Sequence, residues 1–157
     1  MIFGTESLFK IKRKLKNLRP MKKLILIMLA AALVSCEPEC VWVEETAYAG
    51  DVTGDGNAWW FAIDASQSGD YPIYAGQELV PGASVSYDAG SDQITLNFSN
   101  DIQLQNVDEP VKVEGYETLP DSRPAAGLFE LYKGSDQTIQ GNGSNYYVVH
   151  LDVEVCE

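Results

Sequence analysis

The chain contains one histidine, His150, and this is the first residue with the potential for acid–base chemistry. Asp152 and Glu154 follow it at spacings of two. In a β-strand such residues share one face and lie about 7 Å apart, so the three side chains could line a cation site or form an acid–base pair. A solvated polar face on a terminal strand is the simpler interpretation. A single histidine excludes histidine-rich metal centres and any Ser-His-Asp system that does not pass through His150.

A second candidate site is the acidic, glycine-rich segment 51–56. Asp51, Thr53 and Asp55 place oxygen atoms at positions 1, 3 and 5 of a calcium-binding loop, and the glycine after Asp55 falls where such loops turn sharply. Position 12, where a bidentate acid belongs, is Ala62, and a strand-like run follows instead of a helix. The sequence therefore favours a hairpin turn, with calcium at Asp51, Thr53 and Asp55 as the alternative and no other cofactor expected.

Aromatic side chains indicate a binding surface. Trp59 and Trp60 are adjacent in a predicted strand and should point to opposite faces. Trp59 shares its face with the apolar residues Phe61 and Ile63, whereas Trp60 shares its face with Ala62 and Asp64. We therefore predict that Trp60 points outward. Together with Tyr71 and Tyr74, Trp60 could form a flat platform on which sugar rings stack. The competing interpretation is that another strand or loop covers this face and that the rings belong to the core.

Short strands must position these residues. Apolar and polar residues alternate with a period of two through most of residues 41–157, and clusters rich in Gly, Asn, Asp and Pro separate the runs. The clearest run, 145–155, places five apolar residues on a buried face and His150 on a face that should be mostly wet. The sequence predicts an all-β fold, a single antiparallel β-sandwich with Greek-key or jelly-roll connections. Its predicted strands are 41–48, 58–64, 71–75, 83–87, 93–98, 101–107, 111–116, 127–132 and 145–155.

The segment 21–36 resembles the signal sequence of bacterial lipoproteins. Two lysines precede an apolar run of about 10 residues, whereas a membrane-spanning helix needs about 20. The run closes on Leu-Val-Ser-Cys at 33–36, which resembles the lipobox. The resemblance implies that residues 21–35 are removed as a signal peptide and that Cys36 becomes an acylated N-terminus held in a membrane. A plain secretory signal with a chance cysteine is the alternative.

The remaining N-terminal residues are expected to be absent from the mature protein or to form a tether. Residues 1–20 are basic and precede a signal that is already complete from Met21, so we interpret them as an over-extended gene start or a long n-region. Residues 36–40 comprise the lipidated cysteine and a short tether to the domain. Glu37 and Glu39 resemble the acidic tag that directs Bacteroidota lipoproteins to the outer face of the outer membrane.

Three short pieces of the chain are similar to stretches in small, uncharacterised secreted modules of Bacteroidota cell surfaces. They are Thr46-Ala47-Tyr48-Ala49, Tyr74-Ala75-Gly76-Gln77 and His150-Leu151-Asp152-Val153. The resemblance implies an outer-membrane lipoprotein that faces the periplasm or the cell surface, and it carries no known activity.

Charge and cysteines narrow the range of partners. Residues 36–157 hold 22 of the 23 acids but only Lys112, Arg123 and Lys133 as cations, which leaves a net charge of −19. Nucleic acid is therefore excluded as a partner, because phosphate binding requires a basic face. If Cys36 carries lipid, Cys40 and Cys156 remain and can form a disulfide in an oxidising compartment. Free thiols or pairing with another chain are the alternatives.

These observations favour a lipid-anchored, non-enzymatic module that mediates binding or structural interaction at the cell surface. A short chain with one histidine and loops made of turn residues lacks the usual constituents of a catalytic pocket. A glycan-binding module, or an accessory subunit of an outer-membrane complex, is the alternative. A small hydrolase that uses paired carboxylates is the second alternative.

Overall fold

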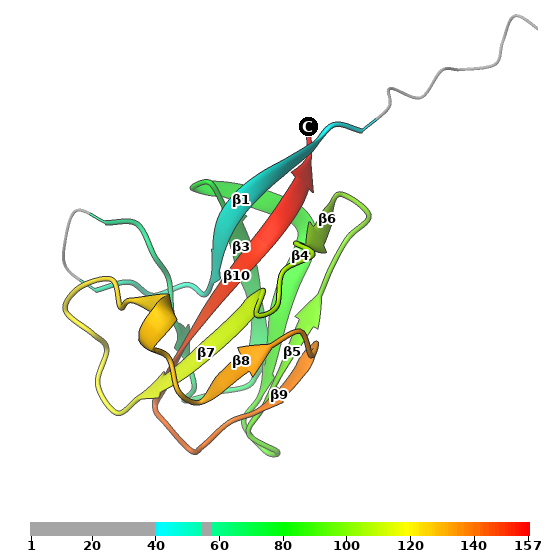
Figure 1. Cartoon of the computed structure of the whole chain (residues 1–157). Coiled ribbons are helices and arrows are strands. Elements are labelled where there is room, and N and C mark those ends of the chain that lie inside the picture. The colour runs from blue at the N-terminus through cyan, green and yellow to red at the C-terminus, as the bar shows by residue number, and fades with distance from the viewer. Residues whose placement is uncertain (1–39, 55–57) are drawn as a thin grey trace, which may run out of the picture. The chain divides into compact units, whose positions relative to one another are not determined.

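The computed structural model describes residues 40–54 and 58–157, which contain ten strands, one 3₁₀ helix and no α-helix (Figure 1). The all-β antiparallel fold predicted from the sequence is confirmed. The elements are β1 (Trp42–Ala49), β2 (Ile63–Asp64), β3 (Gly69–Ala75), β4 (Glu78–Asp88), β5 (Gln93–Asn97), β6 (Ile102–Leu104), β7 (Val111–Tyr116), η1 (Ala126–Leu128), β8 (Tyr132–Gly134), β9 (Thr138–Gln140) and β10 (Tyr146–Cys156).

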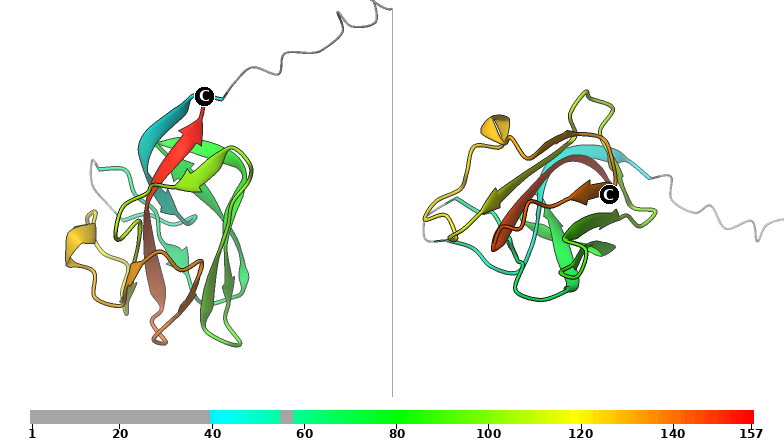
Figure 2. Two further views of the ribbon diagram at one scale, coloured as in Figure 1. Left: turned by 45° about the vertical axis from the view of Figure 1, so that its right-hand side comes forward. Right: turned by 90° about the horizontal axis from the view of Figure 1, so that it is seen from below.

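All ten strands belong to one antiparallel sheet. Its order is β8-β7-β10-β1-β3-β4-β5-β9, and β2 and β6 also pair with β10. The two strands at the ends of this order, β8 and β9, are joined by residues 135–137, and the sheet curls strongly (Figure 2). The sandwich is therefore one continuous sheet folded over on itself, nearly a barrel, because β1 and β3 pair directly and join its two halves.

The concave side of this sheet holds the main core. Its buried residues come from both halves of the sheet, so β7, β10 and β1 face β3, β4, β5 and β9 across a single apolar interior. Strand alternation explains the selection, since β5 buries Ile94 and Leu96 while the intervening Thr95 stays partly exposed. Along β10, the predicted inward face is fully buried at Tyr147, Val149, Leu151 and Val153.

The sequence predicted that the other face of β10 would be mostly exposed to water, and this is wrong for part of its length. Val148 is fully buried and His150 is 9% exposed. The reason is that Val52, residues 59–62 and residues between 119 and 129 pack apolar side chains against the outer face of β1, β10 and β7. Apolar side chains from these segments and from β1 and β10 form a second cluster, the outer cluster. Its buried members are Tyr48, Trp60, Ala62, Phe129 and Val148.

A polar network around Asp92 ties the β4–β5 turn to the β9–β10 turn. Its carboxylate accepts hydrogen bonds from the hydroxyls of Tyr147 (2.7 Å) and Tyr87 (3.0 Å) and from the N–H of Gly143 (2.7 Å). The Tyr147 hydroxyl in turn accepts the N–H groups of residues 142–144. Burial alone would raise the pKa of Asp92, but these hydrogen bonds outweigh burial and hold the pKa below its usual value.

Asp92→Ala should lower the free energy of unfolding by about 2 kcal/mol, because two tyrosine hydroxyls and one backbone N–H lose a charged acceptor. Urea denaturation measures the loss. Asp108→Ala, which removes an exposed carboxylate from the β6–β7 connection, is the matched control and should change stability little. Equal stability of the two variants would show that the Asp92 network does not stabilise the fold.

Candidate functional site

The predicted platform of Trp60, Tyr71 and Tyr74 is wrong, and the competing interpretation, that the rings belong to the core, is confirmed for Trp60 and Tyr71. Trp60 is 1% exposed and Tyr71 is 6% exposed. Trp60 lies in the outer cluster, whereas Tyr71 lies in the main core and its hydroxyl donates a hydrogen bond to the carbonyl of Asp64 (2.8 Å). Of the three rings, only Tyr74 is partly exposed. The structure therefore does not bring these residues together on one surface.

Residues 58–62 do not form the predicted strand. Trp60 is buried because this segment packs against the outer face of the sheet, where the ring joins Tyr48 and Val148. Within this segment only Ala62 makes a strand-like pairing, an isolated bridge to Val52, and β2 begins at Ile63. The preceding chain folds back closely here, since a Cβ on Gly50 would collide with the carbonyl group of Ala62. The segment is thus a loop packed on the outer face of the sheet. Its side chains still alternate, but Trp60 and Ala62 are the buried ones and Trp59 and Phe61 are partly exposed, which is the reverse of the predicted phase.

Several apolar side chains are at least partly exposed on this face. We call four of them, Trp59, Phe61, Tyr74 and Leu79, the outer aromatic patch. Phe61 stacks on Tyr74 with ring centroids 4.4 Å apart and planes inclined by 23°. Trp59 packs edge-on against Tyr48 at 5.3 Å. Leu79 is 56% exposed and lies opposite Tyr74 in the β3–β4 ladder. Sequence reasoning missed Trp59 and Phe61 because it assigned them to the buried face.

His150 is also part of this face, beneath the covering loops. Its ring packs edge-on against Tyr48 with centroids 5.1 Å apart, and its Nδ1 atom has no hydrogen-bond partner among the described residues. Burial lowers the pKa of His150, the carboxylate of Asp152 opposes this shift, and the nearby cations Lys112 and Arg123 add to it. Burial therefore favours the neutral form of His150 in the folded protein.

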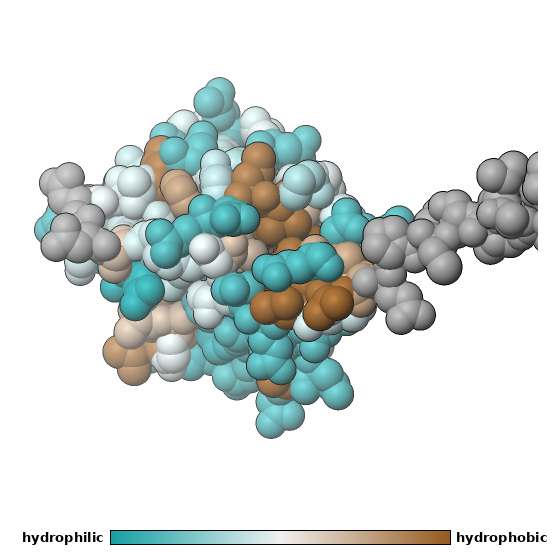
Figure 3. All heavy atoms as spheres, turned by 90° about the horizontal axis from the view of Figure 1, so that it is seen from above, coloured by the Kyte–Doolittle hydropathy of each residue, from teal (hydrophilic) through white to brown (hydrophobic). Residues whose placement is uncertain are grey.

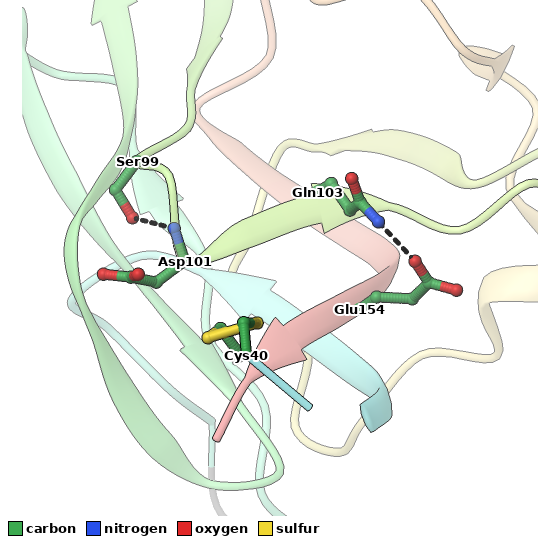
Figure 4. The surroundings of a disulfide bond; sticks show 6 residues. Cys40, Ser99, Asp101, Gln103 and Glu154 are labelled. Carbon is green, nitrogen blue, oxygen red and sulfur yellow. Dashed lines mark hydrogen bonds between the residues drawn. A yellow bond between two sulfur atoms is a disulfide. The ribbon is translucent and has the colours of Figure 1, made fainter. Parts of the chain in front are cut away.

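The predicted acid–base set of His150, Asp152 and Glu154 shares one strand face but is not assembled into a unit. Lys112 forms an ion pair with Asp152. Glu154 instead accepts a hydrogen bond from the side-chain amide of Gln103 on β6 (2.6 Å; Figure 4). Each carboxylate thus has a partner other than the histidine, which is the arrangement of a structural sheet face.

The calcium hypothesis gains no support from the ligand candidates that the structure describes. Asp51 and Thr53 are both exposed, and the Thr53 hydroxyl lies 3.4 Å from the carbonyl of Gly54. Asp55 lies outside the described residues. Across residues 40–54 and 58–157, no group of three or more His, Cys, Asp or Glu side chains is placed to hold a metal ion.

Cys40 and Cys156 form the predicted disulfide (Figure 4). Their Cα atoms are 5.3 Å apart and they are separated by 116 positions in the sequence. The bond lies where β1 begins and β10 ends, so it joins the first and last strands of the domain. Cys36, the candidate for lipidation, is four positions before Cys40 and lies outside the described residues.

Comparison with known proteins assigns no family. No family model matches the chain, and no curated protein or solved structure matches it. Among the described residues, no helix has the length and apolar character needed to cross a bilayer.

The burial of His150 predicts a pH-dependent stability. Because its pKa in the folded protein is below the value of about 6.5 in the unfolded chain, protons bind more readily to the unfolded state. The melting temperature should be highest above about pH 6.5 and fall as the pH drops through and below that value. His150→Phe should remove this dependence between about pH 7.5 and 5.5, where carboxylates stay ionised. An unchanged pH profile in the variant would contradict the assignment.

Proposed function

We propose that this chain is a lipid-anchored protein of the cell envelope whose β domain is a non-enzymatic binding module. The observation that carries the proposal is the disulfide between Cys40 and Cys156. Its first cysteine, Cys40, lies four positions after the lipobox-like Cys36. Structural disulfides persist in oxidising compartments, which agrees with export. The bond also links the start of β1 covalently to the end of β10. A force transmitted through the tether therefore cannot separate β1 from β10 at that end.

The surface best suited to binding is the outer aromatic patch. Its exposed groups are uncharged, which suits contact with another protein in a domain that carries so many acids. Apolar residues gathered on one face of a small domain are typical of interaction sites. Glycan binding is the second candidate, because the stacked rings of Tyr74 and Phe61 are both partly exposed and an aromatic ring can stack on a sugar.

The anchor is tested by changing its cysteine. Cys36→Ser should abolish incorporation of labelled fatty acid and move the protein from the membrane fraction to the soluble fraction, because acylation requires the thiol. The double variant Cys40→Ser and Cys156→Ser is the control and should still be acylated. Membrane retention of the Cys36→Ser protein would contradict the lipid anchor.

A further inference from the structure

The first half of β1 has a free hydrogen-bonding edge. Strand β1 pairs with β10 along its whole length, but it pairs with β3 only from Ala47 to Ala49. One more backbone hydrogen bond, from Gly76 N–H to the carbonyl of Thr46 (3.1 Å), continues that side. Beyond it, no strand among the described residues pairs with 42–45 on the side away from β10.

The phase of the ladder shows which backbone groups point to this free side. Val41 and Glu157 exchange both of their backbone hydrogen bonds, so they form a hydrogen-bonded pair between the two strands. Such pairs alternate along an antiparallel ladder, and the N–H and C=O groups of Trp42 and Glu44 therefore point away from β10. Cys156 opposite Trp42 has the matching phase, because its N–H donates away from β1.

A pocket of about 330 Å³ lies beside this edge, at the end of the domain where the chain enters. The apolar residues Val80, Pro81 and Val155 contribute to its lining. Figure 3 looks onto this end and shows apolar surface exposed among hydrophilic residues. Val41, Trp42 and Leu79, which are 63%, 41% and 56% exposed, belong to this part of the molecule.

The same pocket is lined by the acidic residues Glu45, Glu78 and Glu157. The Glu45 carboxylate lies against Gly76, about 3 Å from where a Cβ would stand. None of the three acids forms an ion pair within the described part of the chain, where the one ion pair joins Lys112 and Asp152. Negative charge at the pocket is therefore not compensated by the domain itself.

We propose that the free edge of β1 binds an extended, basic segment of a partner protein by strand addition, with a Lys or Arg side chain entering the pocket. Strand addition uses unpaired N–H and C=O groups for affinity and pockets for alternate side chains for specificity. A cation with an apolar stem fits a pocket that combines Val80 and Pro81 with three acidic residues.

Two other occupants fit the edge less well. A second copy of this chain pairing through β1 would bring Glu44 and Glu45 toward the same residues of its partner, and like charges opposite one another destabilise a sheet. A bilayer surface with anionic lipids would be repelled by the acidic residues of the pocket. Five residues, 36–40, can reach at most about 14 Å from the first Cα to the last, so the proposed lipid anchor, on which this step rests, would keep the edge close to the membrane and favours a partner embedded there.

The test uses the full-length chain with Cys36→Ser, so that peptide binding is measured without the anchor. The probes are an octapeptide of alternating Val and Lys and a matched octapeptide of alternating Val and Glu, titrated by fluorescence anisotropy. The basic peptide should bind and the acidic peptide should not. Glu44→Pro, which removes an N–H that β10 does not use, should weaken binding about tenfold or more.

The double variant Glu45→Gln and Glu78→Gln should weaken binding similarly and flatten its salt dependence. The control pair Asp108→Asn and Asp121→Asn removes the same charge elsewhere and should retain most of the affinity. If Glu44→Pro lowers the melting temperature, the glutamine variants still decide the outcome. Failure of the basic peptide to bind, binding that neither variant weakens, or dimerisation through the edge in sedimentation would overturn the proposal. Acylation of Cys36 is measured in a separate experiment. Failure of peptide binding therefore does not contradict the lipid anchor, and failure of acylation does not contradict peptide binding at the edge.

Discussion

Trp60→Ala should lower the free energy of unfolding by about 3–5 kcal/mol. The indole is 1% exposed and packs in the outer cluster with Tyr48, Phe129 and Val148. Truncating it removes the largest fully buried side chain of the described residues and leaves a cavity between the covering loops and the sheet. Because a small domain is stabilised by only about 5–15 kcal/mol, the variant should be close to unfolding at physiological temperature.

Urea denaturation at fixed pH measures this effect. Trp42→Ala is the matched control, since Trp42 is 41% exposed at the start of β1, and its loss should change stability by less than about 1 kcal/mol. If the two tryptophan variants are equally stable, Trp60 is not a core residue and the account of the outer face is wrong.

The double variant Cys40→Ser and Cys156→Ser should lose roughly 4–5 kcal/mol of stability on the chain-entropy model. The bond closes a loop of 116 positions, so its removal gives the unfolded chain a large gain in conformational freedom. The loss should be seen as a lower urea midpoint, and wild type under reducing conditions should shift in the same direction. Cys36→Ser, which keeps the bond, is the control.

Peptide mapping without reductant provides an independent check of this prediction. Cys40 and Cys156 should appear in one linked peptide pair and resist alkylation. If both thiols are alkylated in the native protein, or if the double variant is as stable as wild type, the covalent link between β1 and β10 is not a source of stability.

The strongly patterned parts of the fold could be predicted from the sequence. The run 145–155 became β10, and its inward face is buried as expected, because five apolar residues at a period of two leave one register with a buried face. The disulfide could be predicted by elimination, because only Cys40 and Cys156 remain once Cys36 is assigned to lipidation.

Short and loop-borne features could not be predicted in this way. The predicted strand 127–132 corresponds to η1 and the start of β8, and β9 was missed, because strands of three residues carry too little periodicity to be distinguished from turns. The Asp92 network joins two turns about 50 positions apart in the sequence, and no local pattern encodes that contact.

The error at the candidate site has a single physical cause. The sequence placed Trp59 and Phe61 on the buried face, but this segment is a loop that packs on the outer face of the sheet and buries Trp60 and Ala62 instead. Val148 is buried in the outer cluster and His150 is buried beside Tyr48, although the strand pattern alone assigns both to solvent.

The central claim, that the domain is held in a membrane by lipid at Cys36, is tested most directly by the mass of the N-terminal peptide of the protein isolated from membranes. The account predicts a mature chain that begins at Cys36 and carries the added mass of acyl chains on that residue. A mature chain that begins elsewhere, or one in which Cys36 has an unmodified thiol, would contradict it.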